Sequence, residues 1–524
     1  MSTNSSITDL IEGLQDLKYH DPRIPTKLVE PPLDRDSLRM KQMNRPSIPT
    51  ETVAPPLDRD SLRMRQMNRR PGKPALSRDL VKARAVSGLA STVTSTWQNQ
   101  FLLAPIALAT AGRAGYFWAT LVTFIIMYIV YLGFYEKGER WTASAGQYYW
   151  VAQMAPRAFR KALSFFSGWM LVLSWQLFVT AGVMIIGNGA AALVMLHTGT
   201  NYTWLPTVLS SATAFLIYSV NRWAFPLLAQ LEFIFLMYQV VAFVILTLVL
   251  LLLKRGSGLR YATAYDVFLN FDNSSGWPTP AAGQLQRLAN SSVDTARGAC
   301  AVELWRENIK DASSIMPNAL KWAVRLMFIL GVLVTIVVGF SVSNFDAAFE
   351  TELALSGPIG PAVQIIHNAT QESLPWTTSL VALVLVSMLP SCLNAFTAAS
   401  RQLWAFASDQ GLPYSDWIAS VKPTKALLLT AILPVFLPIL NLGSPIALNA
   451  VISLVIIALV SSYMLVATTS LYARCKGWKL YEKSDCYEAR YYLGHWKGYS
   501  VDIFSIVALS IGFVIALLVH GSLT

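Results

Sequence analysis

Apolar stretches that are long enough to cross a lipid bilayer recur along the chain from about residue 87 onwards. A membrane-spanning helix needs about 20 predominantly apolar residues, and ten stretches of roughly this kind are present. They occupy residues 87–112, 116–135, 163–197, 204–220, 225–253, 322–343, 376–407, 425–440, 445–472 and 499–519. The pattern predicts an all-α protein that crosses the membrane about ten times.

The composition favours a single membrane domain with a polar tail. Of the 524 residues, 54% are hydrophobic and 14% are charged, and the mean hydropathy is +0.44, which excludes a set of several soluble domains. We expect a cytosolic tail over residues 1–86 and a transmembrane domain over residues 87–524. The tail carries a tandem 15-residue repeat, 31–45 and 55–69, to which we assign no transport role.

The charge pattern and the glycosylation sequons together predict the orientation. Basic residues crowd the chain just before the first span, which places the N-terminus in the cytosol. The asparagines of four sequons then fall in external loops, provided that one further crossing lies between Asn290 and Lys321. These candidate glycosylation sites are Asn201, Asn273, Asn290 and Asn368.

That further crossing is missing from the hydropathy pattern, because residues 254–321 form one polar gap. Arg287, Asp294 and Arg297 lie inside the gap. Each would cost about 2.5–3.5 kcal/mol at the centre of a membrane helix. A helix of the later half is therefore absent or incomplete.

The reactive residue types show no catalytic or metal-binding pattern. Four cysteines and five histidines are scattered without the spacing of a disulfide framework, a zinc site or a hydrolytic centre. No phosphate-binding glycine motif is visible, so an ATP-driven pump is not indicated. We expect neither an enzyme nor a bound metal or cofactor, and an ion gradient would drive any transport.

Three strings identify the architecture more closely than hydropathy does. They are SAGQYYWVAQMAP at 144–156, AASRQLWAFASDQGLPYS at 398–415 and NLGSPIALNAVISL at 441–454. Together they resemble the fungal amino acid/choline (4-aminobutyrate/choline permease-like) family of the amino acid-polyamine-organocation superfamily. The resemblance implies a leucine-transporter-type core of two inverted five-helix repeats, in which spans one and six break at mid-membrane and bind solute through their backbone.

The resemblance places the break of span one at residues 95–100, STWQNQ. Polar residues here are costly in lipid unless they face a cavity or another helix, and interhelical hydrogen bonding is the alternative to a cavity. In span eight, Ser387 lies on the same polar helical face as Ser391 and Asn394. With the inner half of span six included, the candidate substrate-binding residues are Ser95, Thr96, Trp97, Gln98, Asn99, Gly298, Ser391 and Asn394.

A proton-coupled carrier needs a group that titrates with conformation, and three glutamates are candidates. Glu136 and Glu232 are the carboxylates closest to the membrane in the first half of the chain. Both are predicted near the cytosolic interface, where pairing with a neighbouring Lys or Arg is the alternative role. Glu307 lies in ELWRENIKDASSIMPNAL at 303–320, which resembles the family's cytosolic exit from span six.

Three explanations of the polar gap stay open. They are a wrongly assigned exon boundary in the gene, a decayed paralogue, and a short re-entrant half-helix over residues 298–304 that suffices. We favour the first explanation. The sequence on both sides of the gap keeps the family's register and only the segment between is replaced, which is the result expected of a splice-site error.

These observations predict a proton-coupled secondary carrier for a small amine-containing solute, such as an amino acid, 4-aminobutyrate, choline or a polyamine. Its partners are that solute, a proton gradient and the lipid bilayer, and no nucleic acid is expected. A transport-inactive sensor or scaffold, a truncated paralogue and a metabolite exporter are the alternatives. The plasma membrane is the expected location, with the vacuolar membrane as the alternative.

Overall fold

The computed structural model describes most of the chain beyond residue 94. These residues belong to one compact unit, Leu57–Thr524, and the other unit, Met1–Pro56, lies outside the described residues. Described are residues 92, 95–141, 146–256, 261–271, 312–341, 351, 353, 357–419, 423–443, 447–477 and 493–523. The tail repeat, Gly298, Glu307, Asn273 and Asn290 lie outside them.

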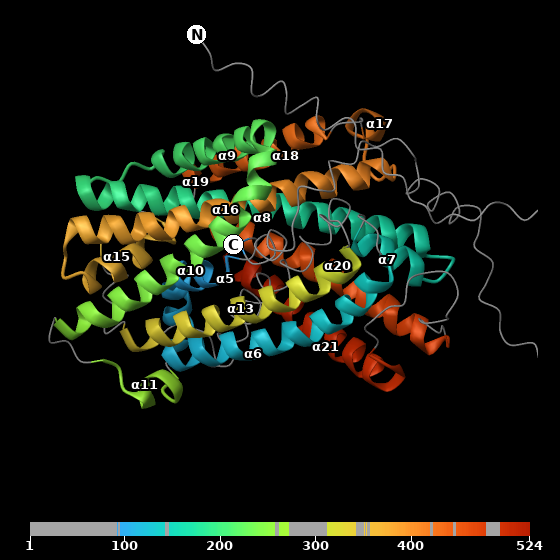
Figure 1. The fold of residues 1–524 in the computed structure, drawn as a ribbon, viewed down its shortest axis with the longest axis horizontal. Coiled ribbons are helices and arrows are strands. Elements are labelled where there is room, and N and C mark those ends of the chain that lie inside the picture. Colours follow the sequence, from blue (N-terminus) through green and yellow to red (C-terminus); the bar gives the residue numbers. More distant parts are fainter. Residues whose placement is uncertain are drawn as a thin grey trace, which may run out of the picture. The chain divides into compact units, whose positions relative to one another are not determined.

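Every regular element in those ranges is a helix, which confirms the predicted all-α fold (Figure 1). The long helices are α6 (Ala104–Arg140), α8 (Arg160–Thr198), α9 (Leu205–Trp223), α10 (Phe225–Gly256), α13 (Ala312–Ser341), α16 (Leu374–Ser408), α18 (Thr424–Phe436), α20 (Ala447–Cys475) and α21 (His495–Leu523). The short ones are α5 (Thr96–Leu102), α7 (Gln147–Met154), α11 (Ala264–Phe268), α15 (Gly360–Ala369), α17 (Ser415–Ile418), η3 (Leu437–Ile439) and α19 (Leu440–Gly443).

Eight helical segments in the described part are long and apolar enough to cross a membrane. They are Gly112–Gly138, Arg160–Thr198, Gln230–Leu252, Trp322–Ser341, Leu374–Ser408, Thr424–Leu442, Ala447–Cys475 and Trp496–Val514. The predicted stretch 204–220 is the 19-residue helix α9, which is not among the eight, and the stretch 87–112 is interrupted. The protein is thus a multi-pass membrane protein.

Span one is broken in the structure, but over a shorter stretch than predicted. Ser95 adopts the left-handed backbone conformation, with φ 43°, and α5 begins at the next residue. Residues 96–100, predicted to be unwound, are therefore helical. Polar side chains do not unwind a helix when a neighbouring helix supplies their hydrogen bonds, and Gln98 has such a partner on α16. A second interruption occurs at Leu103, just before Pro105, which has no N–H to donate to the preceding turn.

Helix α6 contains a turn at Gly112. Gly112 has φ +65°, a conformation that glycine adopts without steric cost, and the candidate membrane span begins at this residue. Residues 104–111 thus continue span one, and the remainder of α6 is span two. Span one is therefore joined to the long part of α6 by a short turn.

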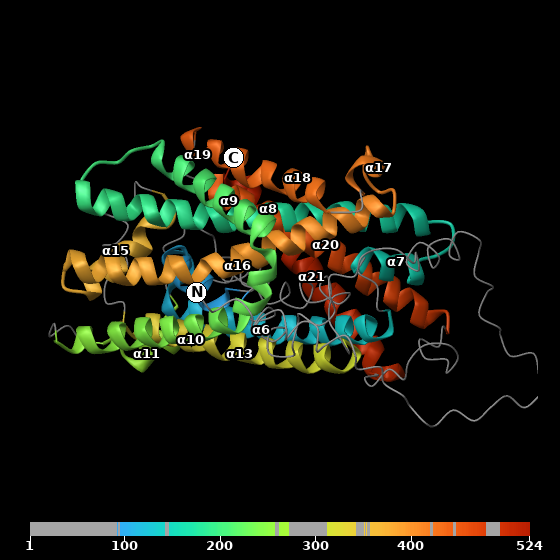
Figure 2. The same ribbon diagram turned by 45° about the horizontal axis from the view of Figure 1, so that its top comes forward.

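Helices α8 and α16 form the interior of the described bundle. In each of them 72% of the most apolar window is buried, compared with 22% in α21 and 28% in α18. Helix α8 packs against α7, α9, α16, α18 and α20, while α6 packs against α13 and α21 (Figures 1 and 2). Peripheral helices therefore surround α8 and α16, and side chains of α8 and α16 can meet away from lipid.

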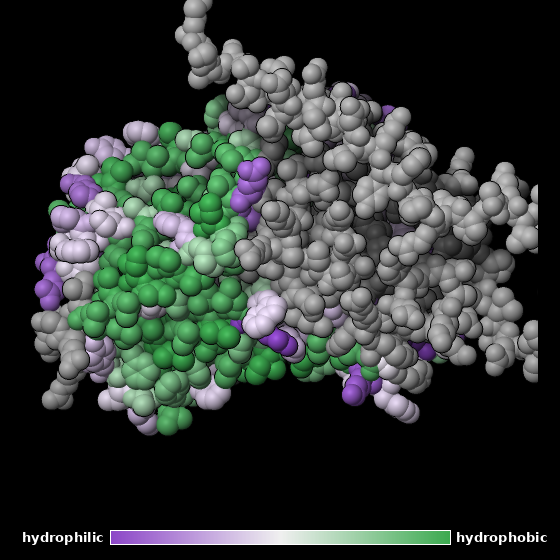
Figure 3. All heavy atoms as spheres, in the orientation of Figure 1, coloured by the Kyte–Doolittle hydropathy of each residue, from purple (hydrophilic) through white to green (hydrophobic). Residues whose placement is uncertain are grey.

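Apolar side chains gather on the outer surface over α10 and α13 (Figure 3). Exposed large hydrophobic residues on α10 include Leu227, Phe233, Ile234, Met237, Val241, Val244, Leu248 and Leu252. In water such a surface would be unfavourable, whereas lipid tails solvate it. The exposed apolar surface thus agrees with a bundle embedded in a bilayer.

Helices α8 and α9 approach closely where α8 has a glycine. A Cβ atom at Gly187 would lie 2.1 Å from the Oγ of Ser210, 2.6 Å from its backbone N and 2.9 Å from the carbonyl oxygen of Pro206. Two of these three atoms belong to the backbone, which cannot rotate away as a side chain can. The packing of α9 on α8 therefore depends on the absence of a side chain at Gly187.

We predict that Gly187→Ala lowers the free energy of unfolding by about 1–3 kcal/mol, because overpacking a close contact outweighs the gain in helix propensity. Gly512→Ala on α21 is the matched control, since a Cβ there meets nothing within 4 Å. Thermal unfolding of the purified protein in detergent measures both. Equal melting temperatures for the two variants would contradict this account of α8 and α9.

Candidate functional site

A cavity of about 50 Å³ lies between span one, α8, α16 and α20. Its polar lining comes from Ser95 and Asn99 of span one and Ser391 of α16, and apolar side chains of α8, α16 and α20 complete it. Gly182 of α8 also lines the cavity, and a Cβ there would lie 2.7 Å from the Sγ of Cys392. Ligand pockets usually measure about 300–1,000 Å³, so a solute has to widen this one.

The structure divides the predicted substrate-binding residues into two groups. Ser95, Asn99 and Ser391 line the cavity together, although they come from segments almost 300 positions apart in the sequence. Trp97 is fully buried with its ring 5.8 Å from that of Phe243 on α10. The cavity is not lined by Thr96, Trp97, Gln98 or Asn394, and Gly298 lies outside the described residues.

Two glutamines anchor α5 and α10 to one point on α16. The Nε2 of Gln98 donates to the Oγ of Ser387 at 3.3 Å and to its carbonyl oxygen at 3.4 Å. The Nε2 of Gln239 donates to the same carbonyl oxygen at 3.3 Å. All three residues are fully buried. The predicted alternative of interhelical hydrogen bonding thus describes Gln98, one turn of α16 away from the cavity.

A buried carboxylate of α10 lies beside Asn394 of α16, one turn beyond Ser391. The Oε2 of Glu232 on α10 accepts hydrogen bonds from the Oγ1 of Thr92 at 3.1 Å and from the Nδ2 of Asn394 at 3.0 Å. Asn394 also donates to Thr92 at 2.8 Å. The Oε1 of Glu232 has no hydrogen-bond partner within the described part of the chain. Glu232 therefore has neutral partners here, rather than the Lys or Arg that an interfacial acid would have.

The cavity and this carboxylate are neighbours along α16. Ser391 lines the cavity and Asn394 holds Glu232, and three residues of a helix advance about 4.5 Å along its axis. Thr92 precedes Ser95 by the same number of residues in span one. A shift of span one relative to α16 would thus alter the lining of the cavity and the partners of Glu232 together.

Glu136 has surroundings of a different kind. Its carboxylate forms a buried ion pair with Arg474 of α20 and accepts a hydrogen bond from the backbone N of Leu493 at 3.4 Å. This is the cation pairing that we gave as the alternative to proton coupling. Sequence reasoning missed Arg474 and Asp502 as its companions, although a lone acid such as Asp502 in an apolar span signals a buried partner.

The remaining predicted residues lie at the surface or outside the described ranges. Asn201 and Asn368 are exposed, and the Oδ1 of Asn368 accepts a hydrogen bond from Gln364 at 2.7 Å. Their glycosylation stays a prediction. Among the described residues, no group of three or more His, Cys, Asp or Glu side chains could hold a metal ion.

Comparison with known sequences identifies the family. The profile of the amino acid permease family matches residues 84–523. The chain belongs to this family. The resemblance to the amino acid-polyamine-organocation superfamily is thereby confirmed, and the family consists of transporters rather than enzymes.

Curated relatives of this permease carry transporter names. A Macrophomina phaseolina protein named as an amino acid/polyamine transporter is 24% identical over 421 residues, covering 78% of this chain and 88% of the relative. A choline transporter of Saccharomyces cerevisiae is 20% identical over 404 residues, covering 73% and 67%. The predicted transport class agrees with these names.

Solved structures confirm the fold of the permease. A mutant form of the Eremococcus coleocola manganese transporter matches with a TM-score of 0.53, covering 86% of this chain and 88% of that chain. The two sequences are only 12% identical, so the match supports the leucine-transporter-type fold and nothing about the solute.

We predict that Asn394→Leu lowers the free energy of unfolding by about 1–3 kcal/mol, because a buried carboxylate loses a donor. Combined with Glu232→Leu, the loss should be smaller than the sum of the single losses, since the two side chains interact directly. Ser461→Ala is the control, because that hydroxyl bonds Ile457 in its own helix. Thermal unfolding of the four proteins measures the coupling, and strictly additive effects would contradict the contact.

Proposed function

We propose that this permease is a proton-coupled secondary carrier for a small amine-containing solute, such as an amino acid, 4-aminobutyrate, choline or a polyamine. The observation that carries the proposal is the position of a buried carboxylate one turn of α16 from a cavity that includes the break of span one. A carrier needs a solute site and a titrating group that respond to the same movement, and both depend here on span one and α16.

The solute is proposed to bind beside Ser95, Asn99 and Ser391. Their side chains offer hydroxyl and amide groups, which can accept from an ammonium group or donate to a carboxylate. The backbone at Ser95 leaves the helical conformation next to the cavity, so main-chain groups can add to these contacts. Because the cavity is small, binding has to be accompanied by a movement of the surrounding helices.

The coupling proton is proposed to be held on Glu232. Its Oε2 links Thr92 of span one to Asn394 of α16, and protonation of the carboxyl group would change which of these bonds it can accept. Movement of span one during solute binding would then alter the free energy of the protonated form, and proton binding would in turn favour one position of span one. Linkage of this kind is reciprocal.

We also propose that the N-terminus lies in the cytosol and that the plasma membrane is the site of action. The basic residues before span one support the first statement. Under this orientation, the ends of α6 and α20 that carry Glu136 and Arg474 face the cytosol.

Uptake by the purified protein in proteoliposomes tests the proposal. Labelled amino acids, 4-aminobutyrate, choline and spermidine are offered separately, with and without an inward proton gradient. At least one should accumulate against its own gradient when protons flow inward. Absence of uptake and of exchange for every solute would contradict the carrier and favour a sensor or scaffold.

The coupling role of Glu232 makes a sharper prediction. Glu232→Gln should abolish accumulation driven by the proton gradient, while exchange of labelled for unlabelled solute continues at a comparable rate, because exchange needs no net proton movement. Glu372→Gln, which alters an exposed acid, should behave like the unmodified protein. Gradient-driven accumulation by Glu232→Gln at the unmodified level would assign the proton to another group.

A further inference from the structure

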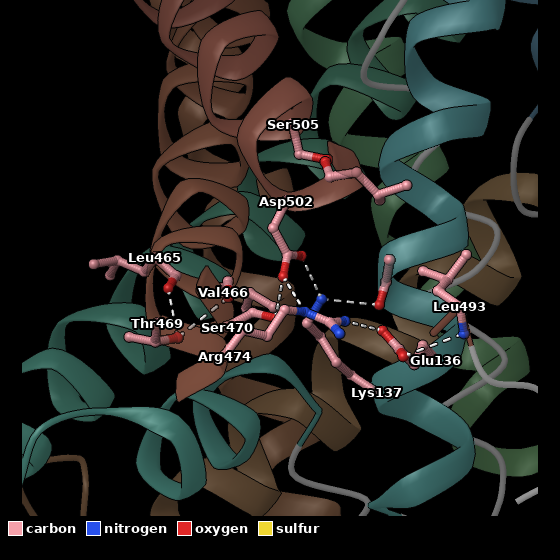
Figure 4. A network of polar contacts seen from close by, with 12 residues as sticks. Glu136, Lys137, Leu465, Val466, Thr469, Ser470, Arg474, Leu493, Asp502 and Ser505 are labelled. Carbon is pink, nitrogen blue, oxygen red and sulfur yellow. Dashed lines mark hydrogen bonds and ion pairs between the residues drawn. The ribbon is translucent and has the colours of Figure 1, made fainter. Parts of the chain in front are cut away.

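Four charged side chains meet where α6, α20 and α21 come together (Figure 4). Arg474 lies between the two acids, because its guanidinium forms ion pairs with Glu136 and, through Nε, with Asp502 at 2.8 Å. The Nζ of Lys137 lies 3.0 Å from the other carboxylate oxygen of Asp502. We call Glu136, Lys137, Arg474 and Asp502 the ionic clamp.

The clamp is electrically neutral and buried. Each of its side chains is at most 3% exposed, and two acids face two bases. A buried charge is tolerated only when it is paired, so separating one member alone is unfavourable. Separation becomes possible when water enters and hydrates all four groups together. The clamp therefore favours two arrangements over any intermediate one. In the first the charges are paired and buried, and in the second they are separated and hydrated.

Glycines on the two outer helices make room for the clamp. A Cβ atom at Gly498 of α21 would lie 2.2 Å from Nη1 of Arg474 and 2.4 Å from its Cζ. A Cβ atom at Gly133 of α6 would lie 3.2 Å from Cγ1 of Val501 and 3.4 Å from Nζ of Lys137. The backbone of α21 thus approaches Arg474 closely at Gly498, and the backbone of α6 lies close to Val501 of α21 and to Lys137 at Gly133. The arrangement is therefore part of the helix packing rather than a chance surface contact.

The clamp lies far from the solute cavity along α20. Val455 lines the cavity and Arg474 belongs to the clamp, and the 19 residues between these positions correspond to about 28 Å of helix. The clamp does not touch the solute and can act only through the position of helices. Helix α6 continues from span one through the turn at Gly112, so a movement of α6 carries a wall of the cavity with it.

We propose that the ionic clamp is a latch that keeps α6 closed against α20 and α21, and that each transport cycle requires it to open. Two of its members lie on α6 and two on the pair α20 and α21, so it joins parts that alternating access has to separate. The inference rests on the proposed transport, but access to the cavity can be measured without any transport.

A reversible disulfide tests whether the latch has to open. Gly133→Cys with Val501→Cys would join α6 to α21 beside the clamp, in a protein whose Cys300, Cys475 and Cys486 are replaced by serine. Oxidation should reduce uptake at least about tenfold, and dithiothreitol should restore it. Unchanged uptake by the fully cross-linked protein would overturn the proposal while leaving the carrier function intact.

A second disulfide provides the matched control. Ser167 of α8 and Ser462 of α20 have hydroxyl oxygens 3.1 Å apart, and replacing both with cysteine would join two helices that the latch does not separate. Oxidation of this pair should leave uptake within about twofold of the reduced protein. An equal loss in both pairs would also overturn the proposal, because the effect would then not be specific to α6.

Opening the latch should expose the cavity from the clamp end. Glu136→Gln with Lys137→Met removes both ion pairs to α6, and it leaves Arg474 and Asp502 as a neutral pair between α20 and α21. Cys392 lines the cavity and is buried, so its alkylation reports access. A membrane-impermeant maleimide added from the clamp end should react at least about fivefold faster than in the protein with Lys497→Met, an exposed control on α21.

Alkylation of Cys392 also separates the latch from the carrier function. Faster reaction from the clamp end supports the latch even if no tested solute is transported. Equal rates in the double variant and in Lys497→Met would overturn it. If the double variant does not fold, the reversible disulfide decides, because its reduced form retains all four clamp residues.

Discussion

Interior polar groups of a lipid-embedded helical bundle have to find their partners within the protein. Lipid offers neither donors nor acceptors, so each buried hydroxyl, amide or charge restricts how the helices around it can pack. This constraint explains why α8 and α16 occupy the interior and why their polar residues meet those of span one, α10 and α20. The exposed helix α21 carries its one acid, Asp502, on the face that touches α6 and α20.

The interior polar groups differ in how fully they are satisfied. The four charges of the ionic clamp are all paired with one another. In contrast, Gln98, Gln239 and Glu232 each keep one side-chain oxygen without a hydrogen bond within the described residues. Fully paired charges separate only when all of them become hydrated together, and an incompletely satisfied group can change its partners at lower cost. A transporter needs both kinds.

Hydropathy predicted the long helices because bilayer thickness dictates their length. The stretch predicted at 163–197 corresponds to α8 and the stretch at 445–472 to α20, each within a few residues. The polar face of α16 was also visible, since helical periodicity places Ser387, Ser391 and Asn394 on one side. The family's strings added the leucine-transporter-type arrangement, which the lengths of the apolar stretches alone do not show.

Partners were harder to predict than faces. Glu136 and Arg474 are 338 positions apart, and periodicity shows which side of a helix is polar without showing what it touches. The same limit applies to Glu232. Its alternative role was pairing with a Lys or Arg, but its carboxylate lies against Thr92 and Asn394. The break of span one was predicted too long because it was placed by the family resemblance, whereas residues 96–100 are helical and Gln98 is hydrogen-bonded to α16.

We infer that α6 moves as a unit against α20 while the interior polar groups exchange partners. A pulsed electron paramagnetic resonance measurement between spin labels tests it most directly, with one label on the exposed Cys475 of α20 and one on Tyr128→Cys, at an exposed position of α6. Movement of α6 should give two distance populations, whose proportions change when a transported solute or a proton gradient is supplied. A single distance that stays the same under every condition would contradict it.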